Sequence, residues 1–149
     1  MDYSLTFDYL GILPRHLAHV PILAERLPTL RIVIDHLGKP PIASGAFEPW
    51  ASLLVAAAKA PNVFAKVSGL DAGQDDCWSA TDLLRYVDHA LKIFGPERLM
   101  YGSDWPVSLL RGGYGKVWRE INAATSQLGP QERARIFGGT AIEVYRLAR

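Results

Sequence analysis

Hydrophobic and polar residues form four short segments that favour strands, and each is followed by a stretch with helical spacing. The strand-like segments are residues 5–10, 31–36, 63–68 and 99–104. Alternating strands and helices are typical of a parallel sheet with right-handed crossovers. The pattern predicts an α/β fold of four β/α units, either a doubly wound open sheet or part of a (β/α)8 barrel. A complete barrel takes about 250 residues, so this chain would form about half of one.

Local signals mark the limits of two of the predicted helices. Residues 76–94 carry apolar side chains at helical spacing, and Ser79 with Asp82 has the pattern of a capping box. Pro21 is expected in the first turn of its helix, because a proline in a helix interior removes a hydrogen bond. Residues 105–116 contain three glycines and are predicted to form a long loop.

Polar side chains recur at the carboxyl ends of three predicted strands. Side chains alternate between the faces of a strand, so residues two apart share a face. The rows that share a face are Ile32, Ile34 and His36, then Phe64, Lys66 and Ser68, and finally Met100, Gly102 and Asp104. Ligands of parallel α/β folds bind beyond the carboxyl ends of the strands. We therefore expect one candidate site made of the last polar residues in these rows: His36, Lys66, Ser68 and Asp104.

Each candidate also has a structural interpretation. A single histidine is more often a hydrogen-bonded structural group than a catalyst, and Asp104 could cap the turn that follows it. Lys66 is harder to explain in this way, because a buried ammonium needs a partner or a ligand. Asp35 has the opposite parity to His36 and is expected to orient a loop or a backbone amide. Trp105 directly follows Asp104 and is expected at the mouth of the pocket.

The composition describes one globular domain with balanced charge. Lys and Arg number 16 against 15 Asp and Glu, and 49% of the residues are hydrophobic. Nucleic-acid binding requires clustered basic residues, so the scattered charges argue against it. No apolar run reaches the roughly 18 residues that span a bilayer, and residues 1–20 include charges where a signal peptide would be apolar. We predict a cytoplasmic protein whose single cysteine, Cys77, forms no disulfide within the chain.

Several common catalytic motifs are absent from the sequence. No G-x-G-x-x-G follows a strand, and neither G-x-x-x-x-G-K-[ST] nor G-x-S-x-G occurs. Dinucleotide, P-loop and α/β-hydrolase chemistry are therefore disfavoured. His16 and His19 could share one helical face, but a zinc site needs more ligands than this pair supplies.

Five segments of the sequence resemble a known family. They are LTFDYLGILPRHL at residues 5–17, IVIDHLGKP at 32–40, PNVFAKVSGL at 61–70, YGSDWPV at 101–107 and GGTAIEVYRL at 138–147. IDHLGKP followed by GSDWP is the most specific signal, and it resembles the metal-dependent hydrolases of the amidohydrolase superfamily, especially the sugar-lactone hydrolases. The resemblance covers nearly the whole chain. It implies a single domain, residues 1–149, that forms strands five to eight of a distorted (β/α)8 TIM-type barrel.

The resemblance implies a role for each candidate residue. His36 resembles the histidine that ends the sixth strand, a metal ligand or a polariser of the carbonyl under attack. Asp104 resembles the aspartate that ends the eighth strand and activates the hydrolytic water. Lys66 and Ser68 resemble substrate-contacting positions after the seventh strand, and His16 lies in a family pattern after the fifth. The predicted substrate-binding residues are Lys66, Ser68, His16 and Trp105.

The chain departs from the family pattern at its start. The first strand of the family usually carries H-x-H or a related polar pair, whereas this sequence has no H-x-H and no residues for strands one to four. The resemblance implies one divalent, zinc-like metal ion that some lactonases use and others do without, with His36 and Asp104 as ligands. Met1 directly before a fifth strand suggests a fragment. The open sheet edges would then be covered by the missing N-terminal half or by a second copy in a homodimer.

The leading hypothesis is a hydrolase of carbohydrate metabolism that opens an aldonolactone or a related cyclic ester. Asp104 would act as general base on water, while His36, Lys66 or a metal stabilises the oxyanion. The alternatives are a metal-dependent decarboxylase of the same superfamily and a catalytically inactive half-barrel that self-associates. The expected ligand is a small-molecule lactone.

Overall fold

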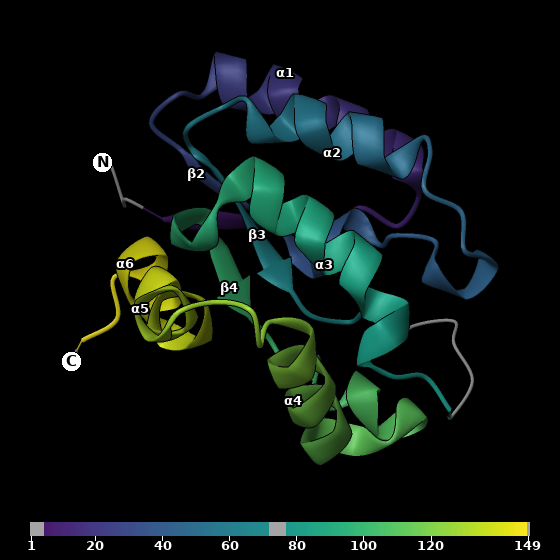
Figure 1. Ribbon diagram of the computed structural model, residues 1–149. Coiled ribbons are helices and arrows are strands. Elements are labelled where there is room, and N and C mark those ends of the chain that lie inside the picture. Colours follow the sequence, from purple (N-terminus) through teal and green to yellow (C-terminus); the bar gives the residue numbers. More distant parts are fainter. Residues whose placement is uncertain (1–4, 72–76, 149) are drawn as a thin grey trace.

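The computed structural model of the protein describes residues 5–71 and 77–148. Within these ranges, four strands form one parallel sheet in chain order (Figure 1). They are β1 (Thr6–Tyr9), β2 (Arg31–Ile34), β3 (Val63–Val67) and β4 (Leu99–Tyr101). The predicted α/β class with consecutive parallel β/α units is confirmed, although every strand ends earlier than the sequence pattern indicates.

Helices follow every strand. They are α1 (His19–Arg26), α2 (Trp50–Ala58), α3 (Ala80–Phe94), α4 (Gly113–Ala124), α5 (Pro130–Ala134) and α6 (Thr140–Tyr145). The backbone N–H of Ser79 donates to Asp82 Oδ2 at 2.8 Å, so the predicted capping box before α3 is confirmed. Pro21 lies in the first turn of α1, as predicted. A π-helical stretch, Arg135–Gly139, joins α5 to α6.

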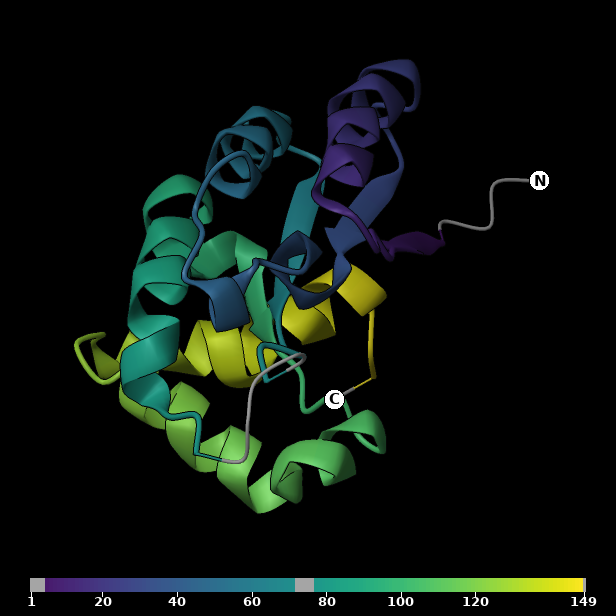
Figure 2. The ribbon, with the colours of Figure 1, turned by 90° about the vertical axis from the view of Figure 1, so that its right-hand side faces the viewer.

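Two hydrophobic clusters are buried on opposite faces of the sheet. The larger one includes Ile32 and Ile34 and packs against the helices that connect the strands. The smaller one contains Val33 and Met100 from the sheet together with Val144 of α6. Figure 2 shows α1, α2 and α3 as a layer on one side of the sheet and α6 on the other. The C-terminal helix therefore packs on part of the face of the sheet that the connecting helices leave free.

The register of the sheet corrects the predicted grouping of side chains. Ile34 pairs with Ala65, and both belong to the helix-covered cluster. Lys66, the next residue of β3, therefore projects from the opposite face. His36 still reaches the side of Lys66, because the chain leaves strand geometry after Ile34. The φ angles of His36 and Leu37 are 55° and 50°, so strand alternation does not extend to them.

The loop predicted at residues 105–116 is largely helical. A 3-10 helix, Val107–Arg111, follows Pro106, and α4 begins at Gly113. The φ angles of Gly112 and Gly113 are 104° and 77°. These glycines permit a sharp turn between two helices, which is why a pattern rich in glycine resembled a long loop.

The two edges of the sheet differ. β1 pairs only with β2 in the described part of the chain, and the Phe7 side chain of β1 is 44% exposed. At the other edge, the C-terminal segment lies beside β4 (Figure 1). The rings of Phe137 and Tyr101 are 5.4 Å apart, and the Thr140 hydroxyl donates to the Pro96 carbonyl at 3.2 Å. β4 likewise pairs only with β3 in the described part of the chain, so both edges lack a strand partner as predicted, while the C-terminal segment packs beside β4.

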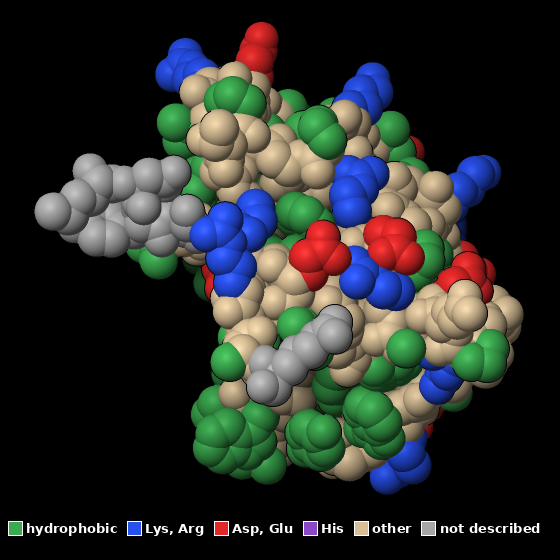
Figure 3. Space-filling view, turned by 90° about the vertical axis from the view of Figure 1, so that its left-hand side faces the viewer, with side chains coloured by type: hydrophobic (Ala, Val, Ile, Leu, Met, Phe, Trp, Pro, Cys, Tyr) green, Lys and Arg blue, Asp and Glu red, His purple; other side chains and the backbone are tan. Residues whose placement is uncertain are grey.

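The helices and the surface charges are compared with what membrane insertion and nucleic-acid binding would require. No helix in residues 5–71 and 77–148 combines the length and apolar character needed to cross a membrane. Figure 3 shows Lys and Arg side chains mixed with Asp and Glu on one face of the molecule. That face presents no continuous basic patch of the kind that binds a phosphate backbone.

Candidate active site

Polar residues predicted from the sequence meet in a cavity at the carboxyl ends of β2, β3 and β4. Its volume is about 350 Å³. The lining residues are Asp35, His36, Lys66, Ser68, Met100, Tyr101, Gly102, Asp104, Ala141 and Tyr145. The structure therefore brings together four of the predicted site residues: His36, Lys66, Ser68 and Asp104.

His36 and Asp104 form the centre of this cavity. His36 Nε2 lies 3.6 Å from Asp104 Oδ1, and each side chain is 17% exposed. On the other side of the ring, His36 Nδ1 lies 2.8 Å from Ser68 Oγ. Both His36 and Asp104 have left-handed backbone, with φ angles of 55° and 54°. Such conformations are costly for residues other than glycine and concentrate at functional sites.

Gly69 leaves room for the His36–Asp104 pair. Its φ is 58°, and a Cβ at this position would lie 2.6 Å from His36 Nδ1 and 3.0 Å from Asp104 Oδ2. Only glycine fits without displacing one of these side chains. The sequence reasoning missed Gly69, although a glycine directly after a predicted strand is a signal of close backbone approach.

Lys66 lies between two carboxylates. Its Nζ is 2.9 Å from Asp35 Oδ1 and 3.3 Å from Asp8 Oδ2. Burial works against the charged ammonium, but the hydrogen bond to Asp35 and the other interactions of Lys66 outweigh it and raise the pKa of Lys66. Lys66 is therefore protonated at neutral pH. The expectation that Asp35 orients a loop is corrected, because Asp35 lines the cavity and binds Lys66.

The C-terminal helix α6 contributes Tyr145 to the same cavity. The Tyr145 hydroxyl donates to Asp8 Oδ1, and the Tyr145 ring centre lies 5.4 Å from Lys66 Nζ. Burial and the bond to Asp8 raise the pKa of Tyr145 to about 12. Tyr145 therefore stays neutral and fixes Asp8 beside Lys66. No local pattern pointed to this contact, because the two residues are 137 positions apart.

Asp71 is a further carboxyl group close to the site. Its exposure is only 4%. Burial raises the pKa of Asp71, and the charge of Asp104 raises it further, while Arg111 acts in the opposite direction. Asp71 therefore binds its proton more tightly than an exposed aspartate does. Sequence patterns gave no sign of its burial.

Two predicted substrate-binding residues do not line the cavity. His16 Nδ1 accepts the backbone N–H groups of Ile12 and Leu13, and its ring stacks on His19 at 6.4 Å. Trp105 is 65% exposed. The left-handed turn at Asp104 directs the carboxylate inward while the next side chain faces solvent.

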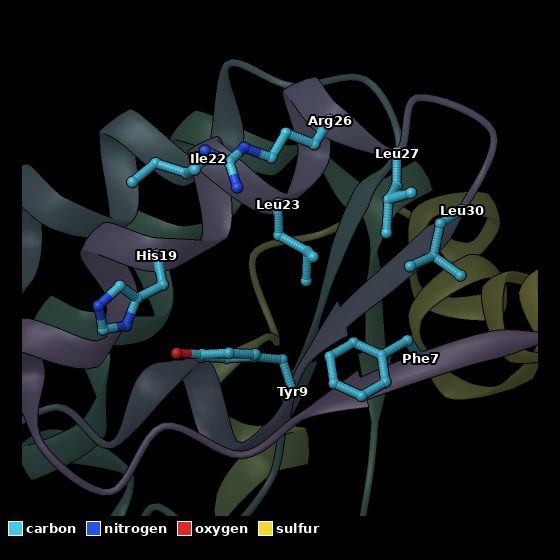
Figure 4. A pocket seen from close by; sticks show the side chains of 8 residues that line it. All are labelled: Phe7, Tyr9, His19, Ile22, Leu23, Arg26, Leu27 and Leu30. Carbon is cyan, nitrogen blue, oxygen red and sulfur yellow. The ribbon is translucent and has the colours of Figure 1, made fainter.

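A second cavity, of about 550 Å³, lies between β1 and α1 (Figure 4). It is lined by Phe7, Tyr9, His19, Ile22, Leu23, Arg26, Leu27 and Leu30. Ile22 is 50% exposed and Leu27 is 46% exposed. This lining has no carboxylate to act as a base, so the smaller cavity is the candidate active site. The apolar groove instead marks the open edge of the sheet.

Comparison with known proteins gives related sequences and structures. Residues 4–147 match the amidohydrolase family. The chain is 46% identical to an L-fucono-1,5-lactonase of Burkholderia ambifaria, over 100% of this chain and 52% of the relative. It is 38% identical to an L-fucono-1,5-lactonase of Burkholderia multivorans, over 98% of this chain and 52% of the relative. The chain thus spans about half the length of these curated relatives.

A solved structure extends this similarity to the fold. The crystal structure of an amidohydrolase from Burkholderia multivorans with bound zinc has a TM-score of 0.88 and 37% identity. The match covers 96% of this chain and 53% of that chain. The four β/α units correspond to about half of that fold, in agreement with the half-barrel predicted from the sequence.

The bound zinc of that structure raises the question of whether these residues could hold a metal. His36 Nε2 and Asp104 Oδ1 are two suitable donors on the same side of the cavity. A zinc site takes three or four protein ligands. The described residues contain no group of three or more His, Cys, Asp or Glu side chains placed for a metal ion. They do not complete a metal site by themselves.

Proposed function

The chain belongs to the amidohydrolase family, and on this basis we propose that it forms one half of a hydrolase that opens an aldonolactone or a related cyclic ester. The observation that carries the proposal is the pairing of His36 with Asp104 at the carboxyl ends of the strands. Nε2 of the His36 ring faces Asp104, and Nδ1 of the same ring contacts the Ser68 hydroxyl. Similarity to two L-fucono-1,5-lactonases supports the substrate class. We assign the four β/α units to strands five to eight of the barrel.

Asp104 is the proposed general base. Its carboxylate lies in the cavity at 17% exposure, where it can accept a proton from a water molecule. As the proton moves to Asp104, the water oxygen forms a bond to the carbonyl carbon of the lactone. The resulting tetrahedral intermediate carries negative charge on the former carbonyl oxygen. A group that stabilises this charge lowers the barrier.

His36 is the proposed group for this stabilisation. Contacts with Ser68 and Asp104 hold its ring in one orientation. Lys66 is a weaker candidate, because Asp35 and Asp8 already share its ammonium. The intermediate collapses when the bond between the carbonyl carbon and the ring oxygen breaks. The ring oxygen takes the proton held by Asp104, and the product is an open-chain hydroxy acid.

The remaining predicted features are part of this proposal. Lys66 and Ser68 would contact substrate hydroxyl groups, since both line the cavity. A divalent, zinc-like ion would use His36 and Asp104 as two of its ligands, with the others supplied from outside the described residues. No step of the proposed mechanism depends on this ion. We place the enzyme in carbohydrate metabolism in the cytoplasm.

We also propose that the open edge of β1 is covered by another polypeptide segment. Phe7, Ile22 and Leu27 expose large apolar surfaces around the groove beside this edge. An unpaired strand next to exposed apolar side chains favours association. The covering segment is either the other half of the barrel or a second copy of the chain.

Proton release in a pH-stat tests the proposed hydrolysis. L-fucono-1,5-lactone is offered to the chain with and without a chelator, and the wild type is compared with His36→Gln. We expect the variant to be about 100-fold slower, the usual loss for a missing oxyanion donor. His19→Gln, a change in an exposed histidine outside the cavity, is the matched control. No opening by the wild type would favour the inactive half-barrel, and equal rates in all variants would place the chemistry elsewhere.

A further inference from the structure

We infer that this site selects uncharged lactones and rejects lactones that carry a carboxylate or sulfonate, because Asp35 and Asp8 neutralise the cation in its wall. The inference rests on the proposed function and adds a basis for its specificity. Among the residues that line the cavity in the described part of the chain, Lys66 is the single Lys or Arg. Within the described lining, it is the side chain that could bind an anionic substituent.

Lys66 is already bound on two sides. Asp35 lies 2.9 Å from its Nζ and Asp8 lies 3.3 Å from it. Tyr145 holds Asp8 in place by donating its hydroxyl to the carboxylate. Asp8 lies on β1 and Asp35 directly follows β2, so the two carboxylates hold Lys66 from two neighbouring strand segments. Asp35 lines the cavity, and α6 holds Asp8 in place beside Lys66.

The charges around the cavity sum to a negative value. Asp35 and Asp104 line it, and Asp8, which does not line it, binds the same Lys66 ammonium as Asp35, so the count is three carboxylates to one ammonium. A protonated His36 would leave one negative charge in excess. Arg111 lies close enough to act on Asp71, but it does not line the cavity. An incoming anion therefore meets like charges in a partly buried site, where screening by water is weak.

An uncharged sugar lactone suits the same wall. Its hydroxyl groups can donate to the carboxylates of Asp35 and Asp104 and accept from Lys66 or Ser68. Hydrogen bonds to charged partners are stronger than neutral ones, so a polyhydroxylated ligand gains from this arrangement. Rejection of the wrong ligand by like charge is a common means of specificity. Asp35 and Asp8 are thus specificity-determining residues of the site.

Two lactones that differ in one group test this inference. Galactono-1,4-lactone has a hydroxymethyl group at carbon 6, and galactaro-1,4-lactone has a carboxylate there. The ratio of their kcat/KM values is measured at low salt in the presence of a chelator. We expect the wild type to favour the uncharged lactone by at least about tenfold, equivalent to about 1.4 kcal/mol. Asp35→Asn and Asp8→Asn should each reduce this preference, because either change frees Lys66 for an anion.

Glu25→Gln is the matched control, since it removes one carboxylate charge from an exposed position outside the cavity. Its ratio should equal that of the wild type. High salt should reduce the wild-type preference without any substitution, because salt screens charge interactions. Equal kcat/KM for the two lactones, or a preference that neither salt nor Asp35→Asn changes, would overturn the inference and leave the proposed function standing. If neither lactone nor L-fucono-1,5-lactone is opened, the proposed function itself fails.

Discussion

Replacement of Gly69 by alanine is expected to damage the candidate site more than the fold. The φ of Gly69 is 58°, and left-handed backbone costs a residue with a side chain about 1–2 kcal/mol. The new methyl group would lie 2.6 Å from His36 Nδ1, well inside van der Waals contact, so the imidazole has to move by most of an ångström. A misplacement of about 1 Å can cost about 100-fold in rate. We expect kcat/KM for lactone opening to fall by about this factor.

Gly45 provides a control with nearly the same backbone. Its φ is 67°, and no atom lies within 4 Å of a Cβ built there. Gly45→Ala should lose a similar free energy of unfolding in urea while it keeps the activity of the wild type. The imidazole nitrogen resonances of His36 should shift in Gly69→Ala alone. Equal activity in the two variants, or unchanged His36 resonances in Gly69→Ala, would refute the idea that residue 69 places the pair.

Three further predictions concern stability and association. Asp71→Asn should raise Tm at neutral pH, because the raised pKa of Asp71 means that its ionised form destabilises the fold; the gain should vanish below the ordinary carboxyl pKa, where folded and unfolded chains are both protonated. An equal gain at both pH values would contradict this. The free energy of unfolding, measured in urea, should be unchanged below pH 10.0 and should fall as the pH rises toward 12. The folded state raises the pKa values of Lys66 and Tyr145, so it favours their protonated forms and loses this advantage when they lose their protons. Tyr145→Phe should weaken that dependence, and an unaltered slope would count against it. Ile22→Lys puts a charge into the groove beside β1 and should reduce self-association in sedimentation velocity; unchanged association would place the contact elsewhere.

The sequence predicted the fold where local pattern decides the structure. Four strand-like segments became four parallel strands in chain order, and Ser79 with Asp82 caps α3. The same logic brought His36 and Asp104 together, since the carboxyl ends of parallel strands meet at one edge of a sheet. It did so even though the strands are shorter than predicted, because a left-handed turn returns His36 to the side of Lys66.

The parts that sequence reasoning missed depend on tertiary packing and on backbone angles. Strand parity separated Asp35 from the site, yet the strand ends at Ile34 and Asp35 binds Lys66. The contact of Tyr145 with Asp8 arises only when α6 packs on the sheet. His16 was assigned to substrate through a family resemblance, whereas in the structure its ring accepts backbone amides near the start of the chain. No periodicity in the sequence carries that information.

The rate of aldonolactone opening by Asp104→Asn is the decisive measurement for the proposed mechanism. Asparagine keeps the shape of the side chain but cannot take a proton from water. We predict a variant with an unchanged fold by circular dichroism and a kcat lower by about 100-fold to 10,000-fold, the range for loss of a general base. A variant that opens the lactone as fast as the wild type would show that Asp104 is not the base and would contradict the proposed mechanism.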